Sequence, residues 1–508
     1  MLEPISKSDW NKFAAAHLLS RAGFGAPASE IDAAAARSPE DVVADLVDFE
    51  RVKEHFDAPA WAVGEHAADR VDKKLYKEMR ELSADEKKAK QKELRQTEQE
   101  QIRELRGWWL KQMRFTKRPL QEKLTLFWHG HWASSAEKVK SSYALFLQNE
   151  TLRKMANGNF HEMTVAMAKD PAMLIYLDNA QSRSAHPNEN FARELMELFT
   201  LGIGNYTEDD IKNSARAFTG WSVGQEKLEF QNRRFIHDDG EKTFMGRKGN
   251  FDGGDIISII LDQPACAPYI AKKLWTFFAY ENPAPELVDK LAATLRESKW
   301  DLKPMLKQMF LSKEFYSKTA VRTQIKSPVQ WLVGTARMLD SPLPDADTCN
   351  GILFMLGQVL FAPPSVKGWD GGYAWITTNS LFSRYNFAGI LIKGGKLMTE
   401  NAPDMMGNVK NNGSGNKQSG QIQKVIRAMA NSASLVDCAK VLPPAARTDK
   451  DHALACLEWQ LYRAELTDKE NAELRESLAK MPDPEKWSDD EIRTILHTMM
   501  STPFYQLT

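Results

Sequence analysis

The stretch RPLQEKLTLFWHGHWASS, residues 118–135, joins a helical pattern to a dense cluster of imidazole and indole side chains. Apolar residues recur at helical spacing up to Trp128, and His129 and His131 then flank Gly130. On a continuous helix the two imidazoles would point about 200° apart, whereas residues i and i+2 of an extended segment share a face. Because glycine readily leaves helical geometry, we expect the helix to end here and the pair to face one cleft.

The HxH pair has two interpretations. It can bind a metal ion or act in acid–base chemistry, or both histidines can be packed, hydrogen-bonded core residues. His131 is the stronger candidate for a ligand or base because it lies beyond the expected helix end, whereas His129 can be packed inside the helix. Under the functional interpretation, the flanking Trp128 and Trp132 exclude water and orient the imidazole rings.

Helical periodicity continues through most of the chain, and one segment interrupts it. Alternating aromatic residues around the sequence HDDG predict a β-hairpin at 227–246. The fold class is therefore mainly α, a multi-helical bundle-like body with one small β-hairpin excursion. The main helical patterns cover 107–128, 140–156, 159–169, 188–201, 207–219, 266–280, 285–297, 302–311, 326–340 and 349–361.

Composition divides the chain into three parts. Residues 1–400 form the expected main helical domain, and 401–420, rich in Gly and Asn, are a predicted flexible linker. Residues 421–508 are predicted to form a smaller helical unit that packs on the main body. The charged run at 68–106 predicts a solvated helix or helical hairpin.

Charge and targeting patterns narrow the function classes. The 508 residues contain 67 Lys+Arg and 68 Asp+Glu, so the net charge of -1 gives no general attraction to nucleic acid or anionic membrane. No apolar window reaches the roughly 18 residues of a membrane span. The N-terminal segment has no signal-peptide pattern, which predicts a cytoplasmic location, with export by another route as the alternative. Nucleotide-loop, nucleophile-elbow and HExxH motifs are absent from the sequence, which disfavours the corresponding chemistries.

The four cysteines have a spacing that suits neither a zinc knuckle nor a disulfide framework. We expect buried free thiols, with a Cys438–Cys456 bridge as the alternative. The other two cysteines are Cys266 and Cys349.

A second candidate segment is HPNENFARELMELFTLG, residues 186–202, which begins with helix-start residues and ends at a glycine. Its carboxylates and arginine recur at helical spacing beside a strongly apolar stripe. They form either a solvated salt-bridged face or an inward polar network. We expect Arg193 to pair with Glu189 or Glu197 and its loss to cost more stability than a surface pair would.

The third segment is IHDDGEKTFMG, residues 236–246. At the tip of the predicted hairpin, His237 and Asp238 provide an imidazole and a carboxylate that suit a transition metal or a general base. Asp239 and Gly240 are also ordinary turn residues, so they need no functional role.

Eight blocks occur in this order along the chain: AAAHLLSRAGFG, LTLFWHGHWASS, NENFARELMELFTLG, ARAFTGW, HDDGEKTFMG, KSPVQWLVGTARML, PPSVKGWDGGYAWITTNSLFSRYNFA and LHTMMSTPFYQL. Together they resemble one known family, the bacterial domain of unknown function 1800. The resemblance covers roughly residues 10–505. It implies a mostly helical protein without an established reaction, often encoded beside a protein that resembles the alkaline phosphatase and sulfatase superfamily.

Most family positions are matched in this chain. The family usually has Asn between the two histidines, and here that position is Gly130. The matching positions in the second and third segments are Glu189, Asn190, Arg193, Glu194, Glu197, His237, Asp238, Gly240 and Lys242. Since three separated segments carry these polar positions, the resemblance favours one shared site.

The combined expectation is a metal-assisted hydrolase of an ester or glycan-type substrate, with a divalent ion of unknown identity in an aromatic-lined cleft. One alternative is a metal-dependent oxidoreductase at the same site. Another is a non-enzymatic helical scaffold or escort for a phosphatase/sulfatase-superfamily-like partner. The expected catalytic residues are His131, His237, Asp238, Glu194 and Arg193; the metal ligands are His129, His131, His237, Asp238 and Glu194; the substrate-binding residues are Trp128, Trp132, Lys242, Trp369 and Trp375.

Overall fold

The computed structural model describes residues 2–64, 81–224, 226–394, 436–447, 449–479, 481, 483 and 487–508. The described chain is mainly α-helical, as the periodicity predicts, and its β-structure consists of two small two-stranded antiparallel sheets. The predicted linker at 401–420 lies outside the described residues.

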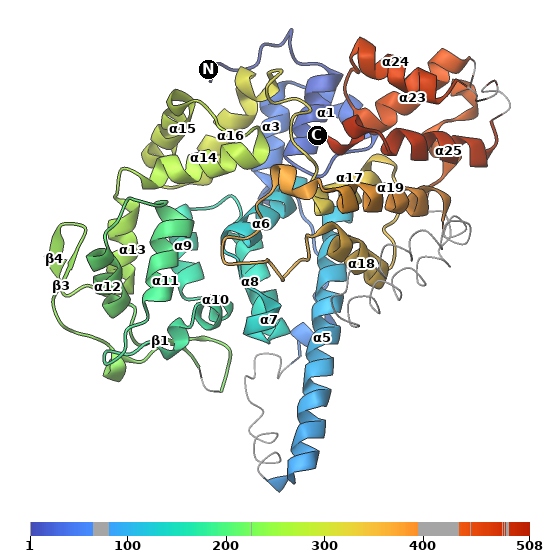
Figure 1. Cartoon of the computed structure of the whole chain (residues 1–508). Helices are drawn as coiled ribbons and strands as arrows, with labels where there is room; N and C mark the ends of the chain where they lie inside the picture. Colours follow the sequence, from blue (N-terminus) through green and yellow to red (C-terminus); the bar gives the residue numbers. More distant parts are fainter. Residues whose placement is uncertain are drawn as a thin grey trace.

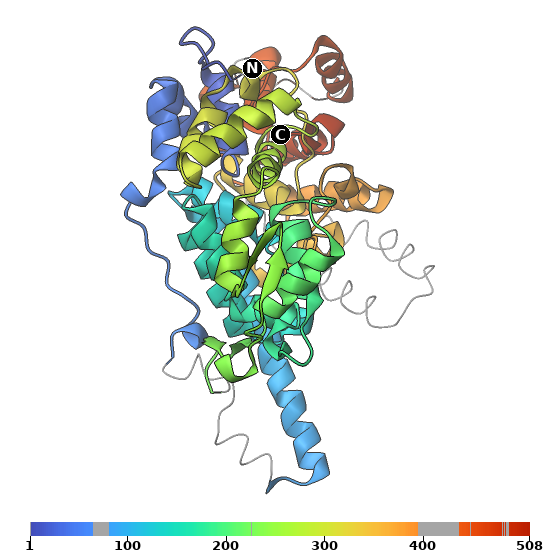
Figure 2. The same cartoon turned by 90° about the vertical axis from the view of Figure 1, so that its left-hand side faces the viewer.

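The N-terminal half is a succession of helices, and the longest of those described is α5 (Ala84–Phe115) (Figure 1). The N-terminal end of α5 projects away from the body in both views (Figures 1 and 2), in agreement with its highly charged sequence. These elements are α1 (Lys12–Arg21), α2 (Ala28–Ala35), α3 (Pro39–Val47), η1 (Phe49–Arg51), η2 (Ala60–Ala62), α5 (Ala84–Phe115), α6 (Pro119–His131), α7 (Ala136–Val139), α8 (Ser142–Lys154), α9 (Phe160–Ala168), α10 (Pro171–Tyr176), η3 (Asn179–Gln181), α11 (Glu189–Glu194), η4 (Leu195–Thr200) and α12 (Glu208–Ala217).

The second half contains both sheets and a further series of helices. The elements are β1 (Trp221–Val223), β2 (Phe230–Asn232), η5 (Arg234–Ile236), β3 (Lys242–Phe244), β4 (Arg247–Gly249), α13 (Gly253–Leu261), α14 (Cys266–Phe278), α15 (Pro285–Glu297), α16 (Leu302–Leu311), η6 (Lys313–Tyr316), α17 (Pro328–Met338), α18 (Ala346–Leu356), η7 (Gly372–Trp375), α19 (Thr378–Lys393), α22 (Cys438–Val441), η8 (Pro444–Ala446), α23 (Lys450–Tyr462), α24 (Asp468–Ser477), α25 (Asp489–Met500) and η10 (Pro503–Gln506).

Local signals account for many helix ends. Ser38 caps α3 by accepting the N–H of Asp41, and Ser83 forms a capping box with Glu86 at the start of α5. The predicted helix at 107–128 is in fact two helices, because the chain leaves helical geometry between Phe115 and Pro119.

The predicted hairpin at 227–246 is wrong in its strand pairing. β2 pairs with β1, and β3 pairs with β4, so the HDDG segment connects two sheets and does not close a hairpin. Alternation of aromatic residues indicates extended structure, but it does not indicate which segments pair.

One apolar core extends from Ile5 to Tyr505 and includes the C-terminal helices. In that core, α25 packs against α19 and α23 packs against α17. All four cysteines are free thiols, so the alternative of a Cys438–Cys456 bridge is wrong. Across the described ranges, no helix is both long and apolar enough to cross a bilayer.

Candidate functional site

The HxH motif lies entirely within helix α6. The helix runs through Gly130 to His131, and the N–H of Trp132 still bonds to the carbonyl oxygen of Trp128 at 2.7 Å. The expectation that glycine breaks the helix is therefore wrong. A glycine inside a helix costs only about 1 kcal/mol, which packing against neighbouring elements easily offsets.

His129 joins α6 to the Pro/Gly-rich loop that precedes α19. Its Nε2 accepts the backbone N–H of Phe361 at 3.0 Å, and its ring packs against Trp109 and Trp369. Burial and the nearby charge of Arg106 lower the pKa of His129 to about 3. The imidazole is thus neutral, and its Nε2 lone pair is already used.

His131 joins the same helix to a different element. Its Nε2 lies 3.0 Å from the carbonyl oxygen of Phe199, so Nε2 carries the proton. Its Nδ1 is buried and has no hydrogen-bond partner among the described residues. Burial, followed by the charge of Lys273, lowers the pKa of His131 well below its usual value. His131 is therefore a neutral, buried donor.

Phe199 belongs to η4, a π-helical turn at the end of the second candidate segment. Side chains of α14 bind a carbonyl group of this turn from outside. The hydroxyl of Tyr269 donates to the carbonyl oxygen of Leu198 at 2.7 Å, and Lys273 Nζ lies 3.3 Å from the same oxygen. Burial lowers the pKa of Lys273 to about 8. Such π-turns are rare and are frequent at functional sites.

The carboxylates on the second segment have different environments. Arg193 forms two 2.8 Å hydrogen bonds with Glu208 and lies 3.9 Å from Glu189, so the predicted contact with Glu189 exists but Glu208 is the main partner. The Arg193 side chain is 35% exposed, which places this pair at the surface. Glu197 accepts the hydroxyl of Tyr206 at 2.5 Å.

Glu194 differs from its neighbours. It is half-buried and forms no hydrogen bond or ion pair with the part of the chain that the structure describes. Burial and the charge of Glu197 raise the pKa of Glu194, and Arg193 opposes that effect. A carboxyl in this state can hold a proton more readily than a surface carboxyl can.

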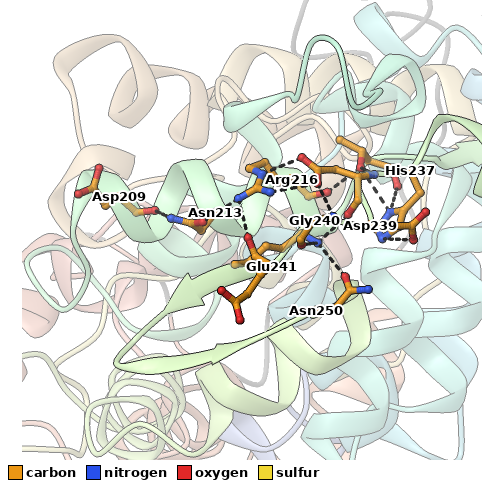
Figure 3. Close-up of polar contacts among 11 residues, drawn as sticks. Asp209, Asn213, Arg216, His237, Asp239, Gly240, Glu241 and Asn250 are labelled. Atoms are coloured by element: carbon orange, nitrogen blue, oxygen red, sulfur yellow. Dashed lines mark hydrogen bonds and ion pairs between the residues drawn. The ribbon is translucent and has the colours of Figure 1, made fainter.

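The HDDG segment is held by two basic side chains, as Figure 3 shows for Arg216. Arg216 binds both carboxylate oxygens of Asp238, at 2.7 and 3.0 Å, and this interaction lowers the pKa of Asp238. Lys242 Nζ donates to the carbonyl oxygens of Asp238 and Gly240, at 2.6 and 2.9 Å. Arg216 and Lys242 therefore both stabilise the loop from inside. Because its ammonium group is used in this way, Lys242 is not a surface substrate-binding residue.

His237 lies on the other side of this loop (Figure 3). Its Nδ1 donates to the carbonyl oxygen of Thr219 at 2.8 Å, which leaves the lone pair on Nε2. Nε2 lies 4.0 Å from Asp239, and the side chain is only 4% exposed. The imidazole is oriented like a base or ligand, but it is covered.

The predicted metal ligands are not gathered in one place. Across the described ranges, no three His, Cys, Asp or Glu side chains lie close enough to hold a metal ion. Asp238 is paired with Arg216, and Nε2 of His129 accepts a backbone N–H. The five-residue ligand set is therefore not assembled in this structure, and a bound ion stays a prediction.

The predicted aromatic lining is largely core. Trp128 is fully buried and its Nε1 donates to Ala156, and Trp132 is equally buried, so the expectation that these two indoles line an open cleft is wrong. Trp375 is also buried, and Trp369 is half-buried against the His129 ring. An indole side chain stabilises the fold most when its large apolar area is completely buried.

Sequence reasoning missed Arg216 and Lys273. Arg216 lies in the ARAFTGW block, but its partner is in another segment, and only contact in three dimensions identifies it. Lys273 had a detectable signal, because it lies on α14 three residues after Ile270 and next to Leu274, both of which belong to the buried face of that helix.

Comparison with known proteins gives one match. A family model described as protein of unknown function (DUF1800) matches residues 17–507. No curated protein and no solved structure matches the chain.

Proposed function

The chain belongs to the DUF1800 family, and we propose that it is a hydrolase of an ester or glycan-type substrate in which Glu194 transfers protons. One observation carries the proposal: Glu194 is a half-buried carboxyl with no hydrogen bond or ion pair among the described residues. The other predicted acid, Asp238, is already neutralised by Arg216.

The chemistry rests on a pair of carboxyl groups one helical turn apart. Burial and the charge of Glu197 raise the pKa of Glu194, so Glu194 can donate a proton to a leaving group. Glu197 accepts the hydroxyl of Tyr206 at 2.5 Å, so its environment differs from that of Glu194. Carboxyl groups whose environments differ in this way divide the roles of acid and base in hydrolysis.

A metal ion is a further part of the proposal. His237 Nε2 keeps its lone pair because Nδ1 donates to Thr219, so this nitrogen is best suited to bind a divalent ion. Such an ion would lower the pKa of a bound water. Elemental analysis of protein purified without added ions tests this part separately.

The test is an assay of the full chain on 4-nitrophenyl esters and glycosides. Glu194→Gln keeps the shape of the side chain and removes its proton, so we expect kcat to fall by about 100-fold or more. Glu297→Gln, on the exposed end of α15, serves as the matched control and leaves kcat unchanged. Equal turnover by wild type and Glu194→Gln overturns the proposal.

A second candidate function is the scaffold or escort for a phosphatase/sulfatase-like partner. The observation that favours it is that both histidines of the HxH motif hold distant segments in place: His129 binds Phe361 and His131 binds Phe199. If this candidate is correct, the purified chain is inactive in the same assays and co-purifies with that partner when the two are co-expressed.

A further inference from the structure

A cavity of about 1060 Å³ is lined by none of the candidate site residues named above, although three of the family blocks contribute His17, Lys326 and Leu507 to its wall. Its wall comes from α1, the segment after α16, the end of α23 and the last residues of the chain. In Figure 1 these elements meet where the blue α1, the C-terminus and the red α23 lie together. The volume is that of a site for a small organic molecule.

Arg463 lines this cavity and is 4% exposed. Its Nη2 lies 3.3 Å from the carbonyl oxygen of Met338, whereas its Nε and Nη1 are buried and find no hydrogen-bond partner in the described part of the chain. It forms no ion pair with any described carboxylate. A buried guanidinium with unsatisfied N–H groups is costly, so this site lacks an acceptor.

Lys326 lines the same cavity and is 6% exposed. Its Nζ donates to the carbonyl oxygen of Tyr505 at 2.7 Å and lies 3.8 Å from the centre of that ring. No described carboxylate pairs with it. Burial, followed by the charges of Arg384 and Arg322, lowers the pKa of Lys326 to about 7.

Two more buried arginines bind backbone carbonyl groups at or next to the cavity wall. Arg21 Nη2 donates to the carbonyl oxygen of Ala320 at 2.5 Å, and Arg384 Nη2 donates to that of Lys326 at 2.7 Å. Within the described residues neither guanidinium has a carboxylate partner, and each has at least one buried N–H without an acceptor. Among the described residues, no carboxylate forms an ion pair with these cations, and Asp32 attracts Arg463 only from beyond ion-pair distance.

The acidic side chains of the cavity lie at its rim. Glu3, Asp9 and Glu465 are exposed, and Glu314 accepts the hydroxyl of Tyr280 at 2.8 Å. None of them reaches the two buried cations. Lys313 and Lys318 are exposed at the same rim, Arg322 is paired with Glu470, and His17 Nε2 donates to Phe315.

The apolar part of the lining comes mainly from Phe13, Tyr316, Val321 and Leu461, and polar residues such as Asn11, Ser317 and Thr467 also contribute. We propose that the cavity binds an organic anion with a carboxylate or phosphate head and an apolar body. The head contacts Arg463 and Lys326, and the body contacts the apolar wall. This binding site is independent of the proposed hydrolase site.

The test is calorimetric titration of the full chain with decanoate and octyl phosphate, with 1-decanol as the uncharged probe. We expect both anions to bind and to raise the melting temperature, while 1-decanol binds at least tenfold more weakly. No binding of either anion, or equal binding of the alcohol, overturns the proposal.

Two variants locate the head group. Arg463→Gln and Lys326→Met each reduce the affinity for decanoate by tenfold or more. Arg247→Gln, which removes an exposed cation paired with Asp262 outside the cavity, leaves the affinity unchanged. Lys326→Met also removes the hydrogen bond to the Tyr505 carbonyl, so the melting temperature of each variant is measured first to show that it is folded. Unchanged affinity in folded Arg463→Gln and Lys326→Met overturns the assignment.

Discussion

At the scale of single residues, the histidines of the HxH motif act through their hydrogen bonds to distant backbone groups. His129 is an acceptor for Phe361, and His131 is a donor to Phe199. Because Nε2 accepts in the first case and donates in the second, His129 carries its proton on Nδ1 and His131 carries its proton on Nε2. Each imidazole therefore holds a specific element against α6.

Replacement of His131 by Ala should destabilise the fold. The change leaves the Phe199 carbonyl without its donor and creates a cavity beside Trp132, so we expect a loss of about 2–4 kcal/mol in the free energy of unfolding. Urea unfolding measures it. His55→Ala, at an exposed position, is the control, and equal stability of the two variants would contradict the prediction.

The lowered pKa of His129 predicts a pH dependence. The folded state keeps this imidazole neutral down to about pH 3, whereas the unfolded chain binds the proton below its usual value of 6.5. Stability is therefore unaffected above pH 6.5 and falls as the pH drops between these values, by roughly 2 kcal/mol at pH 5.

Comparing wild type with His129→Gln isolates the contribution of His129 to the pH dependence of stability, because the other titrating groups, Asp170 included, are common to both proteins. Burial raises the pKa of Asp170 to about 7, which acts in the opposite direction, because the folded state then binds the proton more tightly and gains stability as the pH falls. The measurement is urea unfolding at pH 7 and pH 5. Identical pH slopes for wild type and variant would refute the role of His129.

At the scale of elements, two arginines on neighbouring helical segments have different structural roles. Arg193 joins α11 to α12 at the surface through Glu208, whereas Arg216 fastens the HDDG loop to α12 through Asp238. Solvent screens the first pair, and the second pair is accompanied by backbone hydrogen bonds of the loop.

These two arginines should respond differently to substitution. We expect Arg193→Ala to leave the urea midpoint unchanged and Arg216→Ala to lower it, because Asp238 would lose its partner in the partly buried loop. The expectation from sequence that the loss of Arg193 costs more than the loss of a surface pair disagrees with its 35% exposed side chain. A larger loss for Arg193→Ala than for Arg216→Ala would contradict this account.

At the scale of the whole molecule, the C-terminal helices complete the core. Lys326 bonds through its N–H to the carbonyl oxygen of Gln506 at 2.8 Å, and Ile325 and Leu507 form an antiparallel bridge. Together with the packing of α25 on α19, these contacts tie the chain end to the body.

This continuity predicts cooperative unfolding. Since the described helices share one apolar core, calorimetry should record one transition for the full chain, and a chain that ends at residue 394 should not fold as a soluble monomer. Two separable transitions would instead indicate that residues 436–508 form an independent unit.

The sequence by itself determined the helices, because their signals are local. The predicted ranges 285–297 and 302–311 coincide with α15 and α16, whose apolar stripes and starts at Pro285 and Asp301 are short-range features. It also determined the family, whereas the role of Glu194 stays a prediction.

Tertiary structure alone decided what surrounds those residues. The helix α6 continues through Gly130, and the loop backbone at Gly368 packs directly against it: a Cβ atom on Gly368 would lie 2.3 Å from the Gly130 oxygen. Asp238 meets Arg216, and not the imidazoles, because strand pairing places the HDDG loop beside α12. The unpaired Arg463 faces a cavity formed by both ends of the chain. Each of these contacts joins residues distant in sequence, and local propensity carries no information about such partners.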